Sequence, residues 1–111
     1  MGIQNWSENV VLVDLPAEPE IVDEIDAVVQ IVRDRGDCEV VVDFSSVDII
    51  TSSSISALLK LRKLLTDCQK RLIFCSVSPA TKNIFKVTGI DEIFEFVDDK
   101  FVALASLQLI G

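Results

Sequence analysis

Five hydroxyl side chains occupy six consecutive positions of this 111-residue chain and form its clearest candidate for a functional site. They are Thr51, Ser52, Ser53, Ser54 and Ser56, and they open a stretch of helical apolar spacing. Such hydroxyls accept hydrogen bonds from the free N–H groups of a first helical turn, and each cap stabilises by about 1 kcal/mol. One or two hydroxyls suffice for that role. A phosphate here would meet unpaired N–H groups and the positive end of the helix dipole, so capping and a phosphorylation switch both fit.

The charge of the chain narrows the classes of partner. Ten basic and 18 acidic residues leave a net charge of −8, and the isoelectric point is near 4.3. A protein without a basic excess gains nothing from releasing the counterions of a phosphate backbone or of an anionic bilayer. We therefore expect no nucleic-acid partner and no direct membrane insertion.

The residue types needed for common enzyme mechanisms are missing. The chain has no histidine, which removes Ser–His and Cys–His pairs, and it has neither a GxxxxGKS/T nor a GxGxxG motif. Cys38, Cys68 and Cys75 lack CxxC spacing, which fits a reducing compartment and disfavours a metal site. We expect a cytoplasmic binding module without enzyme activity, metal or cofactor.

Strand-like and helical apolar patterns alternate along the chain, which is typical of an α/β protein. The pattern predicts one domain over residues 1–111, with an N-terminal hairpin, a mostly parallel central sheet and about four helices. The predicted strands are Ile3–Trp6, Val10–Leu15, Glu39–Asp43, Arg71–Ser76 and Ile93–Val97. The predicted helices run from Pro19 to Gly36, from Ser52 to Thr66, from Pro79 to Gly89, and through Phe101 to Leu107 after a cap at Asp98 or Asp99.

Asp43 ends a β-branched run, at the edge of a parallel sheet where ligands and partners usually bind. We expect it to cap the following loop with Ser45 and Ser46 and to border a binding surface. A receiver-type aspartyl phosphate site would need an acidic pair and a strand-end lysine. Asp14 stands alone and the strand ending at Ser76 offers no lysine, which disfavours that alternative.

Residues 60–71 form a basic segment in an otherwise acidic protein. Its members are Lys60, Arg62, Lys63, Lys70 and Arg71, with Asp67 as the one acidic residue, and their net charge is +4. We expect Arg62 and Lys63 to contribute to partner docking and to its rate, and charge reversal there to slow association in a salt-sensitive way. The acidic groups from Glu18 to Asp26 and from Asp91 to Asp99 we interpret as a contribution to solubility.

Two stretches carry a resemblance to a known family. Residues 40–59 read VVVDFSSVDIITSSSISALL and residues 85–94 read FKVTGIDEIF. The first is similar to the strand, aspartate, loop and serine-led helix of the STAS domain in anti-sigma factor antagonists, and the second to that family's helix-Thr-Gly-Leu-strand pattern. The two occur in the right order with nearly ungapped spacing, and the resemblance covers most of the chain.

The resemblance implies a partner switch. In that family, an anti-sigma factor that is also a serine kinase of GHKL type phosphorylates the serine at the start of helix two, and a phosphatase resets it. By position the acceptor is Ser52, with Ser53 as the alternative. The unmodified protein binds the kinase and frees the sigma factor. The expected partner-binding residues are Asp43, Ser45, Thr51, Ser54, Ser56, Arg62 and Lys63.

The same resemblance leaves a second function open. Members commonly have an aspartate before the acceptor and glycines two and four residues after it, where this chain has Thr51, Ser54 and Ser56. Some STAS relatives are never phosphorylated. They serve as scaffolds in stress-signalling assemblies or as a subunit bound to the ATPase of a lipid transporter.

Overall fold

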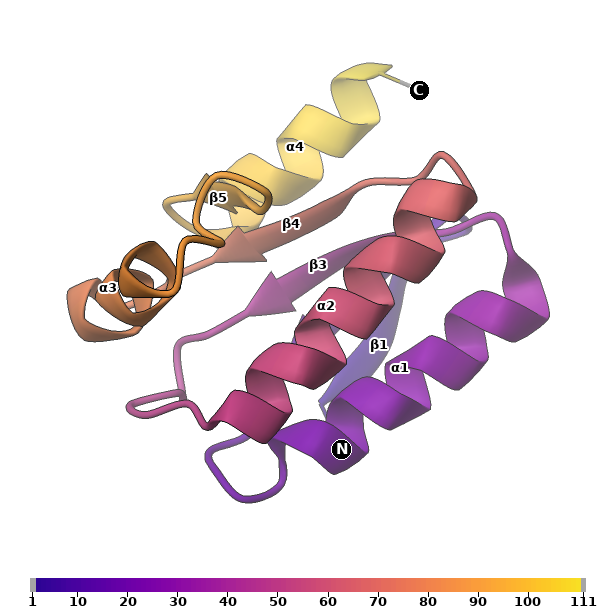
Figure 1. Ribbon diagram of the computed structural model, residues 1–111. Helices are drawn as coiled ribbons and strands as arrows, with labels where there is room; N and C mark the ends of the chain where they lie inside the picture. The colour runs from indigo at the N-terminus through magenta and orange to yellow at the C-terminus, as the bar shows by residue number, and fades with distance from the viewer. Residues whose placement is uncertain (1, 111) are drawn as a thin grey trace.

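The computed structural model describes residues 2–110, with side chains as far as Leu107, and has one five-stranded sheet with four helices (Figure 1). The strands lie side by side in the order in which they occur in the chain. The elements are β1 Ile3–Ser7, β2 Val10–Asp14, α1 Ile21–Arg35, β3 Glu39–Asp43, α2 Ser52–Asp67, β4 Leu72–Cys75, α3 Pro79–Val87, β5 Glu95–Val97 and α4 Lys100–Ile110.

The first two strands form an antiparallel hairpin, and every later neighbour pair is parallel. A parallel pair needs a crossover, and the helices α1, α2 and α3 supply one after each of β2, β3 and β4. The register places Asp14 beside Asp43 and Asp43 beside Cys75. The carboxyl ends of the strands, and the loops that follow them, therefore meet at one edge of the sheet.

Alternating strand residues face two layers. Val11, Val13 and Phe74 belong to the larger cluster with α1 and α2, which lie side by side over one face of the sheet (Figure 1). Leu12 and Ile73 face the opposite way and pack with α4. Burial on both faces explains why β3 has three consecutive valines rather than an alternating pattern.

The predicted α/β class, hairpin, parallel sheet and order of elements are confirmed, and the differences lie at element ends. The last strand begins at Glu95 rather than Ile93, because Ile93 is exposed while Phe94 turns into the core and stacks on Phe74 with ring centroids 4.6 Å apart. The fourth strand is shorter than predicted at both ends. Asp99 is the cap of α4, since its Oδ1 accepts from the N–H of Val102 at 3.0 Å.

Two glycines stand where a helix ends, as the sequence predicts. Gly36 follows α1 with a φ of 72°, and its N–H bonds the carbonyl of Val32 at 2.7 Å. Gly89 follows α3 with a φ of 78°. Within residues 2–110, every helix is too short or too polar to cross a bilayer.

Candidate functional site

The loop after β3 leads into α2 at the carboxyl edge of the sheet, and Thr51 is the cap of that helix. Its backbone is extended, with φ −94° and ψ 164°, and its Oγ1 accepts from the N–H of Ser54 at 3.2 Å. The Thr51 hydroxyl also donates to the Ser54 hydroxyl at 3.2 Å. The capping function predicted for the cluster is confirmed for Thr51, whose hydroxyl is the one that accepts from a first-turn N–H among the bonds of the described residues.

Ser54 lies inside the protein and reaches a carboxylate from a distant part of the chain. Its hydroxyl is fully buried and donates to Oε2 of Glu18 at 2.6 Å, and the N–H of Thr51 donates to the same oxygen at 2.8 Å. Partial burial raises the pKa of Glu18, but these hydrogen bonds outweigh it and leave the pKa below its usual 4.5. Glu18 thus ties the loop after β2 to the start of α2.

Ser52, Ser53 and Ser56 are exposed, unlike Ser54. Among the side-chain hydrogen bonds of the described residues, none involves these three hydroxyls. Their oxygens are therefore open to solvent and to a reagent or partner, at the positive end of a helix dipole.

The loop before α2 presents one apolar side chain to solvent beside these serines. Val47 and Ile50 are buried and hold the loop on the core, whereas Asp48 is exposed and Ile49 is 65% exposed. Only one of two adjacent isoleucines can point inward at this extended stretch. Ile49 is one of several large apolar side chains that the described residues expose, and it is the one that lies next to the free hydroxyls in the chain.

Asp43 supports the same loop from inside. It is only 7% exposed, and its Oδ1 accepts from the N–H of Ser45 at 2.8 Å and from the Ser45 hydroxyl. The loop-capping function predicted for Asp43 with Ser45 is confirmed. Ser46, the other predicted partner, is exposed and takes no part in this cap.

The basic segment divides into tethered and accessible side chains. Arg62 is half-buried and its Nε donates to the carbonyl of Ile93 at 2.8 Å, while Arg71 forms an ion pair with Glu95. Lys63 is exposed and pairs only with Asp67, at 3.3 Å. The guanidinium of Arg62 thus braces the loop before β5 against α2, and a contribution of Arg62 to partner docking stays a prediction.

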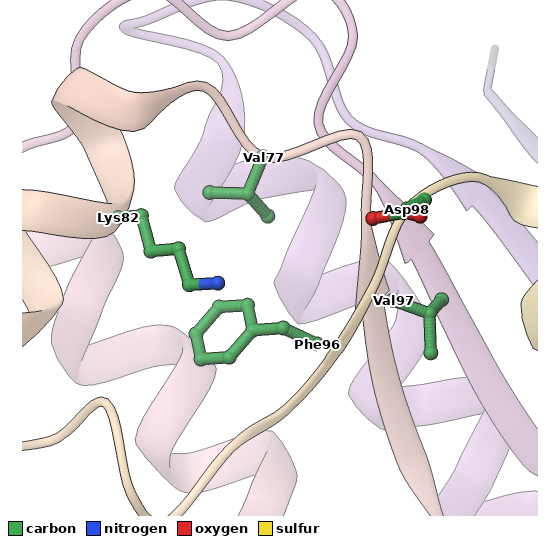
Figure 2. Close-up of a pocket in the computed structure, with 5 residues that line it drawn as sticks. All are labelled: Val77, Lys82, Phe96, Val97 and Asp98. Atoms are coloured by element: carbon green, nitrogen blue, oxygen red, sulfur yellow. The ribbon is translucent and has the colours of Figure 1, made fainter.

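A small hollow opens further along the same sheet edge, where β4 and β5 end. It has a volume of about 140 Å³, and its lining residues are Val77, Lys82, Phe96, Val97 and Asp98 (Figure 2). The Lys82 Nζ lies 5.2 Å from the centre of the Phe96 ring. Such an attraction contributes about 0.5–1 kcal/mol at an exposed site.

The structure brings most of the predicted site residues together and changes what several of them do. Asp43, Ser45, Thr51, Ser54 and Ser56 gather around the loop between β3 and α2. Ser54 and Asp43 are buried. The Ser54 hydroxyl contacts Glu18 rather than solvent, so it does not dock a partner directly, in contrast to the prediction. Asp43 acts on the loop through its hydrogen bond to Ser45.

Two residues of this site are absent from the sequence-based prediction. The sequence assigns Glu18 to a solubilising acidic group and gives Ile49 no function of its own. The signal for Glu18 was its place after β2, because β2 neighbours β3 and their following loops share one sheet edge. For Ile49 the only signal was the Ile49–Ile50 pair itself.

Comparison with known proteins places this geometry in a family. The STAS domain model matches residues 11–102. BtrV of Bordetella bronchiseptica, a candidate anti-sigma factor antagonist, is 28% identical over 75 residues, which span 68% of this chain and 65% of that protein.

Two solved structures share the fold. An anti-sigma-factor antagonist (STAS) domain protein from Planctomyces limnophilus is 24% identical with a TM-score of 0.82, covering 96% of this chain and 97% of that one. The Bacillus cell fate determinant SpoIIAA in its phosphorylated form is 16% identical with a TM-score of 0.73, covering 95% and 96%. Since the family model matches most of the chain, the protein belongs to the STAS domain family.

Proposed function

We propose that the protein is an anti-sigma factor antagonist that works by partner switching. In its unmodified form, the exposed surface formed by Ile49, Ser52, Ser53 and Ser56 binds an anti-sigma factor that is also a serine kinase of GHKL type. Phosphate transfer from ATP to Ser52 releases that partner, and a phosphatase restores the binding form. The protein itself acts by binding, in the cytoplasm, and performs no catalysis.

One observation carries this proposal: the hydroxyls that open α2 divide into two structural groups. The Thr51 hydroxyl accepts from the N–H of Ser54, and the buried Ser54 hydroxyl donates to Glu18. Ser52 and Ser53 are exposed and are not needed for the fold of the helix. A phosphate on Ser52 would therefore leave the cap intact and change only the surface.

The charges around Ser52 explain how a phosphate would act. A phosphate adds close to two negative charges, and the nearby loops contribute Glu18 and Asp48 but no Lys or Arg between residues 44 and 59. This stretch of the chain therefore supplies no cation to pair with the phosphate, and we expect the phosphate to stay hydrated. A partner that covers the neighbouring Ile49 would have to remove that water, so the contact becomes unfavourable.

Two relatives support the proposal by what they are. BtrV is a candidate anti-sigma factor antagonist, and SpoIIAA, which shares the fold, has been solved in a phosphorylated form. The residue-level assignment to Ser52 rests on its position as the first residue of α2.

Intact-mass measurement with peptide mapping, on protein recovered from its own host, tests this proposal. We expect one phosphate on Ser52, which disappears in Ser52→Ala and persists in Ser53→Ala. The matched control is sound because both side chains are exposed at the same helix start. Phosphate that persists in Ser52→Ala and disappears in Ser53→Ala would move the acceptor to Ser53.

A second candidate function follows from the residues around the acceptor. Ser54 and Ser56 stand where the family commonly has glycines, and Ser54 is committed to Glu18 rather than leaving room for close backbone approach. This favours a STAS subunit that is not phosphorylated, in a scaffold or beside a transporter ATPase. A pool that stays unmodified after mixing with candidate kinases and ATP would favour this function over the switch.

A further inference from the structure

A shallow groove runs between α1 and α2, on the side of the helices that faces away from the sheet. It has a volume of about 180 Å³, and its lining residues are Val29, Arg33, Lys60, Lys63, Leu64 and Asp67. The two helices lie side by side in Figure 1 and contact each other along much of their length. The groove lies toward their C-terminal ends, beyond the serines that open α2.

The groove collects positive charge that is separated in the sequence. Arg33 comes from the last turn of α1, and Lys60 and Lys63 come from the second half of α2. With Asp67, the lining side chains carry a net charge of +2 in a chain whose net charge is −8. The other arginines of this region are tethered elsewhere: Arg35 to Asn5 and Glu8, and Arg62 to Ile93.

The floor of the groove is apolar, because Val29 and Leu64 lie between the charged side chains. A cationic rim around an apolar floor matches a peptide in which acidic and aliphatic side chains alternate. A nucleic acid would use the rim but gain nothing from the floor, and the net negative charge of the chain opposes its approach.

We propose that this groove docks an acidic segment of a partner protein, with carboxylates on Arg33, Lys60 and Lys63 and an aliphatic side chain over Val29 and Leu64. Lys63 forms an ion pair with Asp67, with Nζ and Oδ2 3.3 Å apart, and both side chains are largely exposed. Exposed pairs of this kind are weak, so an incoming carboxylate can displace Asp67. This docking goes beyond the switch at Ser52 and does not depend on phosphorylation.

The groove lies on the same stripe of α2 as one of the exposed serines. Ser56, Lys60, Lys63 and Asp67 follow each other at spacings of three or four residues, so they lie along one stripe of α2. Lys60 is about 6 Å along the helix axis from Ser56. A partner bound at Lys60 would therefore lie within about one helical turn of the exposed Ser56.

Titration of the ¹⁵N-labelled full chain with a short, blocked peptide of alternating Glu and Leu tests this proposal. We expect saturable shifts of backbone resonances at Arg33, Lys60, Lys63 and Leu64. The double variant Lys60→Glu/Lys63→Glu should weaken binding about tenfold, because it reverses two rim charges that each contribute a modest amount. Asp67→Asn should strengthen binding about twofold to threefold, because it removes the competing carboxylate.

The control is Lys86→Glu/Lys100→Glu, which changes the net charge equally but lies on α3 and α4, outside the groove. It should leave the affinity within about twofold of the wild type. Equal weakening by both double variants would overturn the proposal, as would absence of saturable shifts. A single-stranded oligodeoxynucleotide or phosphatidylglycerol vesicles that shift the same residues at lower concentration than the peptide would also overturn it.

Discussion

The helices α2 and α3 begin with the same hydroxyl arrangement. In α2 the cap Thr51 accepts from the N–H of Ser54, and in α3 the cap Ser78 accepts from the N–H of Thr81, both at 3.2 Å. In each pair the cap hydroxyl also donates to the second hydroxyl, and that second residue is fully buried. Both helices start beside the carboxyl end of a parallel strand.

The two starts differ in what is added to this arrangement. The first turn of α3 continues with Pro79 and Ala80, which add no functional group. The first turn of α2 continues with Ser52 and Ser53, and its buried hydroxyl extends to Glu18. The cap and its buried hydroxyl partner account for two hydroxyls in each helix, so the additional serines of α2 need another explanation.

The largest difference that we expect between the two helix starts is in partner binding. Phosphate on Ser52 should lower the affinity for the anti-sigma partner about a hundredfold. The reason is that the phosphate charge is unpaired and that the partner can no longer cover Ile49. Adding a carboxylate at the corresponding turn of α3, by Ala80→Glu, should change the affinity less than about threefold. Isothermal titration calorimetry of the phosphorylated, unmodified and Ala80→Glu proteins measures both. Equal affinities for the first two would remove the functional difference between the helices.

The buried hydroxyls should differ in what they contribute to stability. Ser54→Ala removes a hydrogen bond to a carboxylate and should cost about 2 kcal/mol of unfolding free energy. Thr81→Val keeps the size of the side chain and removes a hydroxyl without a carboxylate partner, so it should cost about 1 kcal/mol. Urea denaturation of the two variants tests the difference. A larger loss for Thr81→Val would show that Glu18 adds little.

The tie to Glu18 should also make the start of α2 sensitive to pH. The pKa of Glu18 in the folded protein lies below the usual 4.5, so its stabilisation is complete above that value and is lost as the pH falls through the folded pKa. At neutral pH, Glu18→Gln should reduce the unfolding free energy by about 1 kcal/mol, and this difference should shrink below pH 4.5. Denaturation curves at several pH values measure it.

Glu20→Gln is the matched control for that experiment. Glu20 is exposed at the end of the same loop, and its side chain makes no capping bond to α1. It should leave the stability unchanged within about 0.5 kcal/mol. A difference between wild type and Glu18→Gln that grows as the pH falls would contradict the assigned function of Glu18.

The smallest expected effect concerns the exposed serines. Ser52→Ala and Ser53→Ala should each change the unfolding free energy by less than about 0.5 kcal/mol, because neither hydroxyl contributes a bond to the fold. The reverse change in α3, Ala80→Ser, should be equally small. Thermal denaturation of the three variants measures this, and a loss as large as that of Ser54→Ala would assign Ser52 or Ser53 a structural function.

Much of the fold followed from short-range patterns. The helical spacing in α1 and α2, the valine run of β3 and the stops at Gly36 and Gly89 each depend on a few neighbouring residues. The cap at Thr51 likewise needs only the following turn. The start of the last strand was less predictable, because Ile93 and Phe94 are both apolar and only the packing of Phe94 on Phe74 decides which points inward.

The α/β class, the order of the elements and the placement of the hydroxyl cluster at a helix start follow from the sequence, because periodicity and capping are local properties. Which hydroxyls are free depends on tertiary contacts, since Ser54 is buried and donates to a carboxylate 36 residues away. Tertiary contacts also tether Arg62 to Ile93 and bring Arg33 beside Lys60 and Lys63. These contacts join segments that meet only when the loops and helices of neighbouring parallel strands pack together, and no short stretch of sequence carries that information.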